Sequence, residues 1–278
     1  MKNGSLENSK IVFVGCGVMA ESIIAGLLRE KLMKPEQIAA THPREARRNE
    51  LIGKYGLVVF EDNTACFTTP EFSDSIVVLS VKPQRIQGIL KELNGSVKAS
   101  QLVISIVAGA KLSSISDGLN APLIVRAMPN TPAQIGAGMT VWTCSAETDE
   151  TQREQVQELF GALGKALPVE TENMIDMATS LSATGPTYIF MMMEALTDAG
   201  VHMGFSRDLS KELVQQTMLG STLFAIDSHK HPAELRNMVT SPGGTSAAAI
   251  YEMEKGGLRT VLSKAVYAAY KRAVDLGK

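Results

Sequence analysis

A short glycine-rich segment near the N-terminus has the residue types and spacing that hold a phosphate. It follows the apolar run Ile11–Val14 in the order G-x-G-x-x-A, with Gly15, Cys16, Gly17, Val18, Met19 and Ala20. In this pattern the first glycine allows a tight turn, the second lets a ligand approach the backbone, and the small last residue lets helix and strand pack closely. N–H groups at the start of the helix then attract the phosphate. The segment predicts a bound dinucleotide, and a turn without a ligand is the alternative.

The residues after the second expected strand indicate which dinucleotide binds. An enzyme that uses NAD is expected to carry Asp or Glu about 20 residues after the turn, where the carboxylate binds the ribose hydroxyls. Here the chain has Thr41, His42, Pro43 and Arg44, followed by Arg47 and Arg48. No carboxylate repels a 2′-phosphate and a guanidinium can pair with it, so NADP(H) is favoured, with NADH as a weaker alternative. The other interpretation is that the arginines only decorate the next helix.

Two further strand ends are expected to face the same crevice, because ligands of open parallel sheets bind beyond the carboxyl ends of the strands. One end carries Val81, Lys82 and Pro83, and the other carries Ala108 and Gly109. Lys82 could reach the nicotinamide, its ribose or the substrate. It could equally be a solvated lysine.

A second glycine pair lies in the C-terminal part of the chain. Residues 242–244 are Pro-Gly-Gly and precede an expected helix that begins at Thr245. Such a segment can expose successive N–H groups that attract an anion. The hydroxyls of Ser241, Thr245 and Ser246 could add donors, or they could simply cap the helix. Both interpretations stay open from the residues alone.

The elements that must position these residues form two domains. Up to about Val169, β-branched runs alternate with amphipathic stretches, which predicts an α/β, Rossmann-type doubly wound parallel sheet. Its strands are expected at residues 11–14, 38–40, 57–60, 75–81, 102–107 and 123–127, with a further pair at 139–143 and 166–169. Helices are then expected at residues 172–182, 186–203, 206–228, 232–238, 245–254 and 258–276. We predict an NADP-binding domain at 1–169 and an all-helical domain at 170–278.

Composition narrows the class of protein. The chain has 278 residues, 45% of them hydrophobic, and a formal net charge of −2, which suits two modest cores and small-molecule partners rather than nucleic acid or a membrane. The polar N-terminus and the lack of an apolar run near the ~20 residues of a membrane span predict a cytoplasmic protein. Three widely spaced cysteines fit neither disulfides nor a metal site, so we expect small buried side chains at Cys16, Cys66 and Cys144.

These motifs together resemble the pyrroline-5-carboxylate reductase family over nearly the whole chain. The resemblance begins with the glycine turn, Asn63, Val81–Pro83 and Ala108–Gly109. It continues with Arg-Ala-Met-Pro-Asn-Thr-Pro at 126–132, Ser-Ala-Thr-Gly-Pro-Thr-Tyr at 182–188 and Val-Thr-Ser-Pro-Gly-Gly-Thr-Ser at 239–246. The last motif is the most specific, since Pro-Gly-Gly flanked by hydroxyl residues is unusual in a helical domain outside this family.

The resemblance implies NADPH-dependent reduction of the cyclic imine pyrroline-5-carboxylate to L-proline, the last step of proline biosynthesis. It implies that Asn63 and Val81–Pro83 contact the cofactor. It further implies that the helical domain forms dimers, with the active site completed across the subunit boundary, and that the substrate carboxylate is held by Ser241, Gly243, Gly244, Thr245 and Ser246. Ser246 stands where the family usually has Thr, and Thr187, where Ala is common, adds bulk that could reshape the pocket.

Lys82 and Ser246 are the candidate catalytic residues. A protonated iminium accepts hydride readily, so we expect orientation of the reactants, rather than a strong acid, to drive the reaction, with Lys82 in a supporting electrostatic or cofactor contact. None of the four histidines falls in a catalytic constellation. The alternatives are a related β-hydroxyacid-type dehydrogenase and a protein that senses NADP(H) without turnover.

Overall fold

The structure is a computed structural model that describes residues 5–277. These residues form two compact units. The first unit extends to Thr184 and takes in the end of the chain from Ala269, and the second unit is Gly185–Ala268. Within residues 5–277, no helix has the length and the apolar run that crossing a membrane requires.

The first unit is built on one eight-stranded sheet with the order β3-β2-β1-β4-β5-β6-β7-β8. The strands are β1 (Ile11–Val14), β2 (Ile38–Thr41), β3 (Val58–Phe60), β4 (Ile76–Leu79), β5 (Val103–Ser105), β6 (Ile124–Met128), β7 (Gly138–Cys144) and β8 (Gly164–Pro168). The chain order reverses at β1, where β4 lies on the side opposite β2. This switch point is where ligands of doubly wound sheets bind.

The sheet is parallel from β3 to β6 and again between β7 and β8, so a single pairing, that of β6 with β7, departs from the predicted parallel sheet. β7 pairs antiparallel with β6, with Met128 opposite Val141, and β8 then runs parallel to β7. The β6–β7 connection covers only residues 129–137, whereas a parallel neighbour needs a crossover of roughly a dozen residues or more. The chain therefore turns back beside β6.

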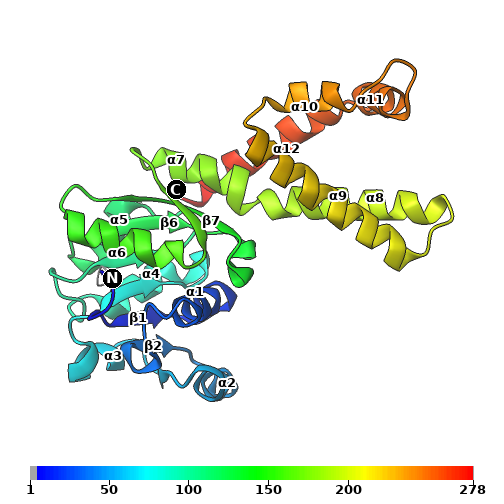
Figure 1. Ribbon diagram of the computed structural model, residues 1–278. Coiled ribbons are helices and arrows are strands. Elements are labelled where there is room, and N and C mark those ends of the chain that lie inside the picture. The colour runs from blue at the N-terminus through cyan, green and yellow to red at the C-terminus, as the bar shows by residue number, and fades with distance from the viewer. Residues whose placement is uncertain (1–4, 278) are drawn as a thin grey trace. The chain divides into compact units, whose positions relative to one another are not determined.

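Helices cover both faces of the sheet (Figure 1), and alternate side chains of the strands supply a core on each face. Ile11 and Phe13 pack with α1 (Val18–Arg29), α2 (Glu45–Tyr55) and α6 (Glu150–Gly161). Val12 and Val14 pack on the other face with α3 (Ala65–Thr68), α4 (Ile86–Leu93) and α5 (Leu112–Leu119). Helices on both faces explain why the central strands are apolar along their whole length, and the predicted Rossmann-type class is confirmed.

Short 3₁₀ turns join several of these elements, namely η1 (Pro35–Gln37), η2 (Pro70–Phe72), η3 (Pro83–Arg85) and η4 (Thr131–Ile135). After β8 the chain forms α7 (Asn173–Ala178), which continues as a π-helical turn, η5 (Thr179–Ala183). Ile175 of α7 is buried against Met128 and Val141 in a third, small core. The helix predicted at 172–182 is thus present, with its last part wound more widely.

The second unit is helical throughout, as predicted. It contains α8 (Gly185–His202), α9 (Arg207–Ser228), α10 (Pro232–Met238), α11 (Thr245–Lys255) and most of α12 (Leu258–Leu276). The turn between α8 and α9 is closed by Ser206, whose hydroxyl caps α9, and by Ser210, whose hydroxyl donates to the Thr197 carbonyl at 2.8 Å. A Cβ at Gly200 would lie 1.9 Å from that hydroxyl, so the two helices approach closely there.

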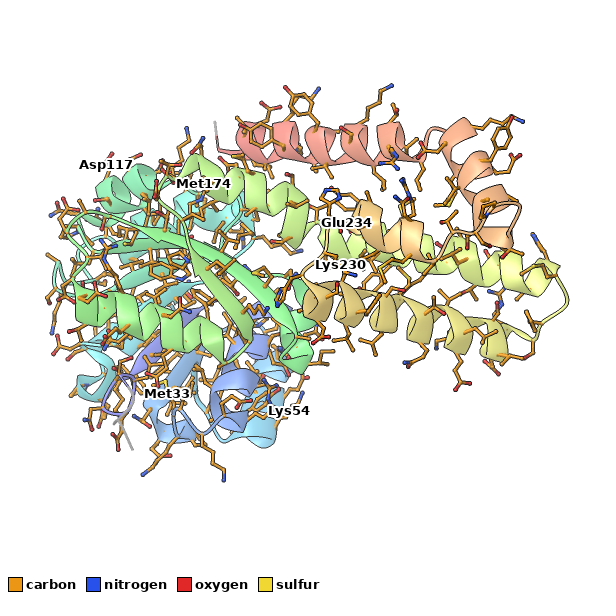
Figure 2. The ribbon with its side chains drawn as sticks, turned by 45° about the horizontal axis from the view of Figure 1, so that its top comes forward. Met33, Lys54, Asp117, Met174, Lys230 and Glu234 are labelled. Carbon is orange, nitrogen blue, oxygen red and sulfur yellow. The ribbon has the colours of Figure 1, made fainter. Side chains whose placement is uncertain are left out.

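The helices of this unit leave large apolar side chains uncovered. Phe190, Met191, Leu219, Leu223 and Ile226 are each more than half exposed, and the side chains of the long helices stand out along their length (Figure 2). Monomeric proteins rarely expose a continuous apolar surface of this kind. This surface fits self-association through the helical unit.

The cysteines follow the prediction in part. Cys16 and Cys66 are buried, whereas Cys144 is half-buried, and all three are free thiols. Cys144 is the last residue of β7, where the strand leaves the sheet beside Ser145. The prediction of a buried residue is wrong there because the strand end reaches the edge of the core.

Candidate active site

The glycine turn is fixed by the fold at its first position. Gly15 has a φ of +81°, and a Cβ there would lie 2.6 Å from Cγ1 of Val81. Only glycine combines that left-handed conformation with so close a neighbour. The carbonyl of Gly15 accepts a hydrogen bond from the Ser80 hydroxyl, which ties the turn to the end of β4.

Gly17 differs, because nothing in the protein requires a glycine there. Its φ of −82° and ψ of −170° are open to any residue, and an added Cβ would meet no atom within 4 Å. Gly17 is the N-cap of α1, and no side chain caps the helix. The free N–H groups of the first turn, on Val18, Met19 and Ala20, therefore face an open space that suits the pyrophosphate of a dinucleotide.

Side chains of the turn pack inward or stay clear of this space. Cys16 and Ala20 are buried, and burial raises the pKa of the Cys16 thiol to about 12, so it stays protonated. The Cys16 N–H already donates to the Thr41 carbonyl at 3.0 Å. Val18 is 65% exposed and Met19 packs against the core. Any contact of this segment with phosphate thus comes from backbone rather than from side chains.

Thr41, the last residue of β2, holds the glycine turn in place through hydrogen bonds. Its fully buried hydroxyl accepts from the Gly15 N–H at 3.0 Å and donates to Oδ1 of Asn63 at 2.5 Å. The Asn63 amide donates in turn to Glu92 at 3.0 Å. From the sequence, Thr41 is notable only as a residue near the position where an NAD enzyme is expected to carry a carboxylate. The signal that could have revealed it is a hydroxyl residue closing an otherwise apolar strand.

The three arginines beyond β2 have different surroundings. Arg47 pairs with Glu21 and Glu50, and Arg48 pairs with Glu61 while also donating to the carbonyls of the preceding loop. Arg44 is exposed at the N-cap of α2, and among residues 5–277 no acceptor lies within hydrogen-bond distance of its guanidinium. Arg44 is thus the guanidinium available to a ligand.

The carboxylate of Glu21, in the first turn of α1, is bound by side chains of α2 that include Arg47. Burial alone would raise the pKa of Glu21, but hydrogen bonds from Lys54, Arg47 and Tyr55 lower it to about 2. Lys54, labelled on α2 in Figure 2, lies 2.8 Å from the Glu21 carboxylate. The negative charge of Glu21 is therefore compensated beside the uncapped start of α1.

His42 directly follows β2 and precedes Arg44 by two residues. Its Nδ1 accepts from the Arg44 N–H at 3.2 Å. Partial burial, and then the nearby charge of Arg44, lower the pKa of His42 below its ordinary value of 6.5. The imidazole is neutral at pH 7, while Pro43 beside it is exposed.

The next strand ends bring Val81, Lys82 and Pro83 to the same edge of the sheet. Val81 is half-buried against Gly15, and Pro83 opens η3. Lys82 is exposed, and within residues 5–277 its ammonium has no hydrogen-bonding partner. Ala108 packs into the small core around Ile175, and Gly109 has a φ of +78°. The predicted cofactor residues of the first unit thus gather at the carboxyl edge of β1, β2, β4 and β5.

The second unit presents another glycine-capped helix start. Gly243 has a φ of +71° with no atom within 4 Å of an added Cβ, and Gly244 is the N-cap of α11. No side chain caps this helix. Ser241 and Thr245 are exposed and Ser246 is half-buried. Of the two interpretations left open, helix capping by these hydroxyls is not observed, and they stand beside free N–H groups.

Comparison with known proteins identifies the family. The model for pyrroline-5-carboxylate reductase dimerisation matches residues 172–276, and the model for NADP oxidoreductase, coenzyme F420-dependent, matches residues 10–109. The pyrroline-5-carboxylate reductase of Synechocystis is 40% identical over 95% of this chain and 97% of its own. The chain belongs to the pyrroline-5-carboxylate reductase family. This family consists of NAD(P)H-dependent oxidoreductases.

Solved structures agree with this assignment. The pyrroline carboxylate reductase of Plasmodium falciparum with NADP bound has a TM-score of 0.87 and 29% identity, covering 98% of this chain and 99% of its own. The pyrroline-5-carboxylate reductase of Coxiella burnetii has a TM-score of 0.86 and 35% identity over 97% of this chain and 99% of its own. The match of the dimerisation model to the helical part agrees with the uncovered apolar surface there.

Proposed function

We propose that this chain reduces pyrroline-5-carboxylate to L-proline, the last step of proline biosynthesis, with NADPH as the preferred reductant and NADH as a weaker one. The observation that carries the proposal is the pair of glycine-capped helix starts, at Gly17 and Gly244, each with free N–H groups and no side-chain cap. One suits a pyrophosphate and the other a small carboxylate. Two anion sites of this kind match the two ligands of the reaction.

The cofactor side of the site rests on backbone and on Arg44. The N–H groups at the start of α1 bind the pyrophosphate at Gly17, and Thr41 with Asn63 holds the turn in place. Arg44, with His42 and Pro43 beside it, receives the 2′-phosphate. The strand-end residues Val81–Pro83 and Ala108–Gly109 bound the nicotinamide half. Because Arg47 and Arg48 have carboxylate partners, Arg44 accounts for the preference for NADPH.

The substrate side rests on the segment before α11. The N–H groups that follow the Gly243–Gly244 turn, from Thr245 onward, hold the carboxylate of the imine together with the hydroxyls of Ser241, Thr245 and Ser246. The N–H of Gly244 itself closes the turn by donating to the Ser241 carbonyl. This anchor fixes one end of a five-membered ring and so orients its carbon–nitrogen double bond. Orientation of two bound reactants removes entropy from the barrier.

The chemistry itself needs little from acidic side chains. When bound, NADPH supplies the hydride that is added to the ring carbon. The nitrogen carries its proton in the iminium form, so the residues of this chain serve to bind and orient. Lys82 acts near the reacting ring as an electrostatic or cofactor contact, and Ser246 acts through the carboxylate.

The working unit extends beyond one chain. The functional division lies near residue 169, with the cofactor held by residues 1–169 and substrate binding and dimerisation assigned to 170–278. The chain works in the cytoplasm as a dimer or a larger oligomer. Cell fractionation with an antibody to the chain tests the location.

A steady-state assay tests the proposed activity. The purified protein is mixed with the cyclic imine and NADPH, and the loss of NADPH absorbance that depends on the imine is measured. The double variant Thr245→Ala, Ser246→Ala should lose at least about tenfold in kcat/KM for the imine, because each hydrogen bond to a charged group is worth about 1.5–3 kcal/mol. Its NADPH affinity should stay unchanged. Wild-type protein that binds NADPH and shows no imine-dependent oxidation would refute the proposal.

A further inference from the structure

The loop from Ala108 to Leu112, between β5 and α5, is held by residues from the far end of the sequence. In the proposed function this loop borders the nicotinamide half of the cofactor. Three contacts reach it from residues beyond 170, and all of them lie within the first unit.

The first contact comes from Glu172, directly before α7. Its Oε1 accepts from the N–H of Leu112 at 2.8 Å and from the guanidinium of Arg126 at 3.1 Å. One carboxylate oxygen therefore joins the start of α5 to the middle of β6. Charge-assisted hydrogen bonds of this kind are the strong ones.

Arg126 makes this arrangement rigid. Its side chain is 2% exposed, and its other terminal nitrogen donates to Asp176 at 2.6 Å. Within residues 5–277, its Nε has no partner. A buried guanidinium depends on its carboxylates, so Glu172 and Asp176 are both held in place. Only Glu172, however, also reaches the loop.

The second contact comes from the last turn of the chain. A Cβ at Gly109 would lie 2.5 Å from the carbonyl oxygen of Leu276, and a Cβ at Gly277 would lie 3.0 Å from the Gly109 oxygen. Backbone lies directly against backbone, which explains a glycine at 109 without any ligand. A cavity of about 240 Å³ beside this contact is lined by Pro83, Ala108, Gly109, Lys111, Leu276 and Gly277.

The third contact is apolar. Ala108 packs on the small core that contains Ile175 of α7, with Ala178 and Ala183 beside it. The loop thus contacts both the α7 region and the end of α12. The family model for dimerisation begins at residue 172 and ends at 276, so the two ends of the dimerisation region meet at a single loop of the cofactor domain.

We propose that Glu172, Leu276 and Gly277 are positioning residues for the cofactor, which fix the loop 108–112 in the conformation that receives the nicotinamide half. The inference rests on the proposed function in one respect, that a nicotinamide dinucleotide binds at this edge of the sheet. It adds a specific coupling: the folded dimerisation region sets the affinity of the neighbouring domain for its cofactor.

The chain contains a matched pair of variants for the test. Glu172→Ala and Asp176→Ala each remove one partner of Arg126, but only Glu172→Ala also removes the acceptor of the Leu112 N–H. Hydrogen exchange of the Leu112 amide in the cofactor-free protein should accelerate about tenfold more in Glu172→Ala than in Asp176→Ala. The dissociation constant for NADPH, measured by fluorescence titration, should rise about fivefold in Glu172→Ala alone. Glu172→Gln, which keeps an acceptor oxygen, should restore both values.

The other end of the region is tested by shortening the chain. A protein that ends at Asp275 should bind NADPH about fivefold more weakly, with faster exchange at residues 108–112, while one that ends at Gly277 should match the wild type. Equal effects of Glu172→Ala and Asp176→Ala on exchange and affinity would overturn the proposal, as would unchanged affinity in the shortened protein. Neither readout uses the imine, so a failure of the proposed reductase activity would be recognised separately.

Discussion

The two glycine-capped helix starts, at α1 and at α11, use the same local device in different surroundings. Each has a glycine N-cap without a side-chain cap and a glycine with positive φ shortly before it. Protein atoms already surround Gly15: Val81 lies close to it, and Thr41 and Ser80 form hydrogen bonds with its backbone. Around Gly243 no atom lies within 4 Å of an added Cβ.

This difference separates glycines that the fold requires from glycines that a ligand requires. Gly15 cannot change without strain inside the protein. Gly17 has an ordinary φ and free space beside it, so nothing within the protein requires a glycine there. Gly243 also has free space beside it, but its φ of +71° itself favours glycine. The free space has a use only when an anion or a second surface fills it. The first helix start is rigid before the ligand arrives, whereas the second is a set of donors on an exposed segment.

The largest expected effect distinguishes the two glycines of the first turn. Gly17→Ala should weaken NADPH binding by about 10- to 100-fold, because the methyl group enters the space of the pyrophosphate and blocks charge-assisted hydrogen bonds. Its unfolding free energy should change by less than about 1 kcal/mol, since the new Cβ meets no protein atom. Isothermal titration and chemical denaturation measure the two quantities.

The matched control is Gly15→Ala. Its positive φ costs roughly 1–2 kcal/mol for an L-residue, and the clash with Val81 adds to this. Stability should therefore fall in Gly15→Ala and cofactor affinity in Gly17→Ala. If both variants lost stability equally, the distinction between fold-required and ligand-required glycines would be wrong.

A smaller effect on cofactor binding is expected when Arg44 is replaced. This residue adds a charged side chain to the backbone donors at the first helix start. Arg44→Ala should raise the KM for NADPH about tenfold and leave the KM for NADH nearly unchanged, because only NADPH carries the 2′-phosphate. Arg48→Ala is the control, since that guanidinium already pairs with Glu61. Equal changes for the two cofactors would contradict the proposed phosphate contact.

Local patterns in the sequence were enough to predict the glycine turn before α1 and the helices of the second unit. The spacing of Gly15 and Gly17 between an apolar run and a helix predicts the turn, and the helices of residues 185–276 begin and end within a residue or two of their expected limits. These features depend on neighbours along the chain, so a local pattern records them.

Features that depend on distant contacts could not be predicted in this way. The buried hydroxyl of Thr41 has meaning only once Gly15 and Asn63 lie beside it. The position of Gly109 after a strand predicts a cofactor contact, yet the atom nearest to an added Cβ there belongs to Leu276, which lies far along the chain. The antiparallel direction of β7 likewise depends on its pairing with β6, which the short connection of residues 129–137 permits.

The smallest expected effect concerns pH and applies to the first helix start alone. The pKa of His42 lies below 6.5 because of burial and the charge of Arg44. A 2′-phosphate bound at Arg44 favours the protonated imidazole, so binding raises this pKa and takes up a proton. NADPH affinity relative to that of His42→Asn should therefore increase roughly two- to threefold as pH falls from 7.5 to about 6, because this comparison cancels the titration of the 2′-phosphate itself near pH 6. The segment 240–246 contains no group that titrates in this range, so it adds no such dependence. Fluorescence titrations with NADH should give a flat profile, and equal pH profiles of wild type and His42→Asn with NADPH would assign the proton to another group.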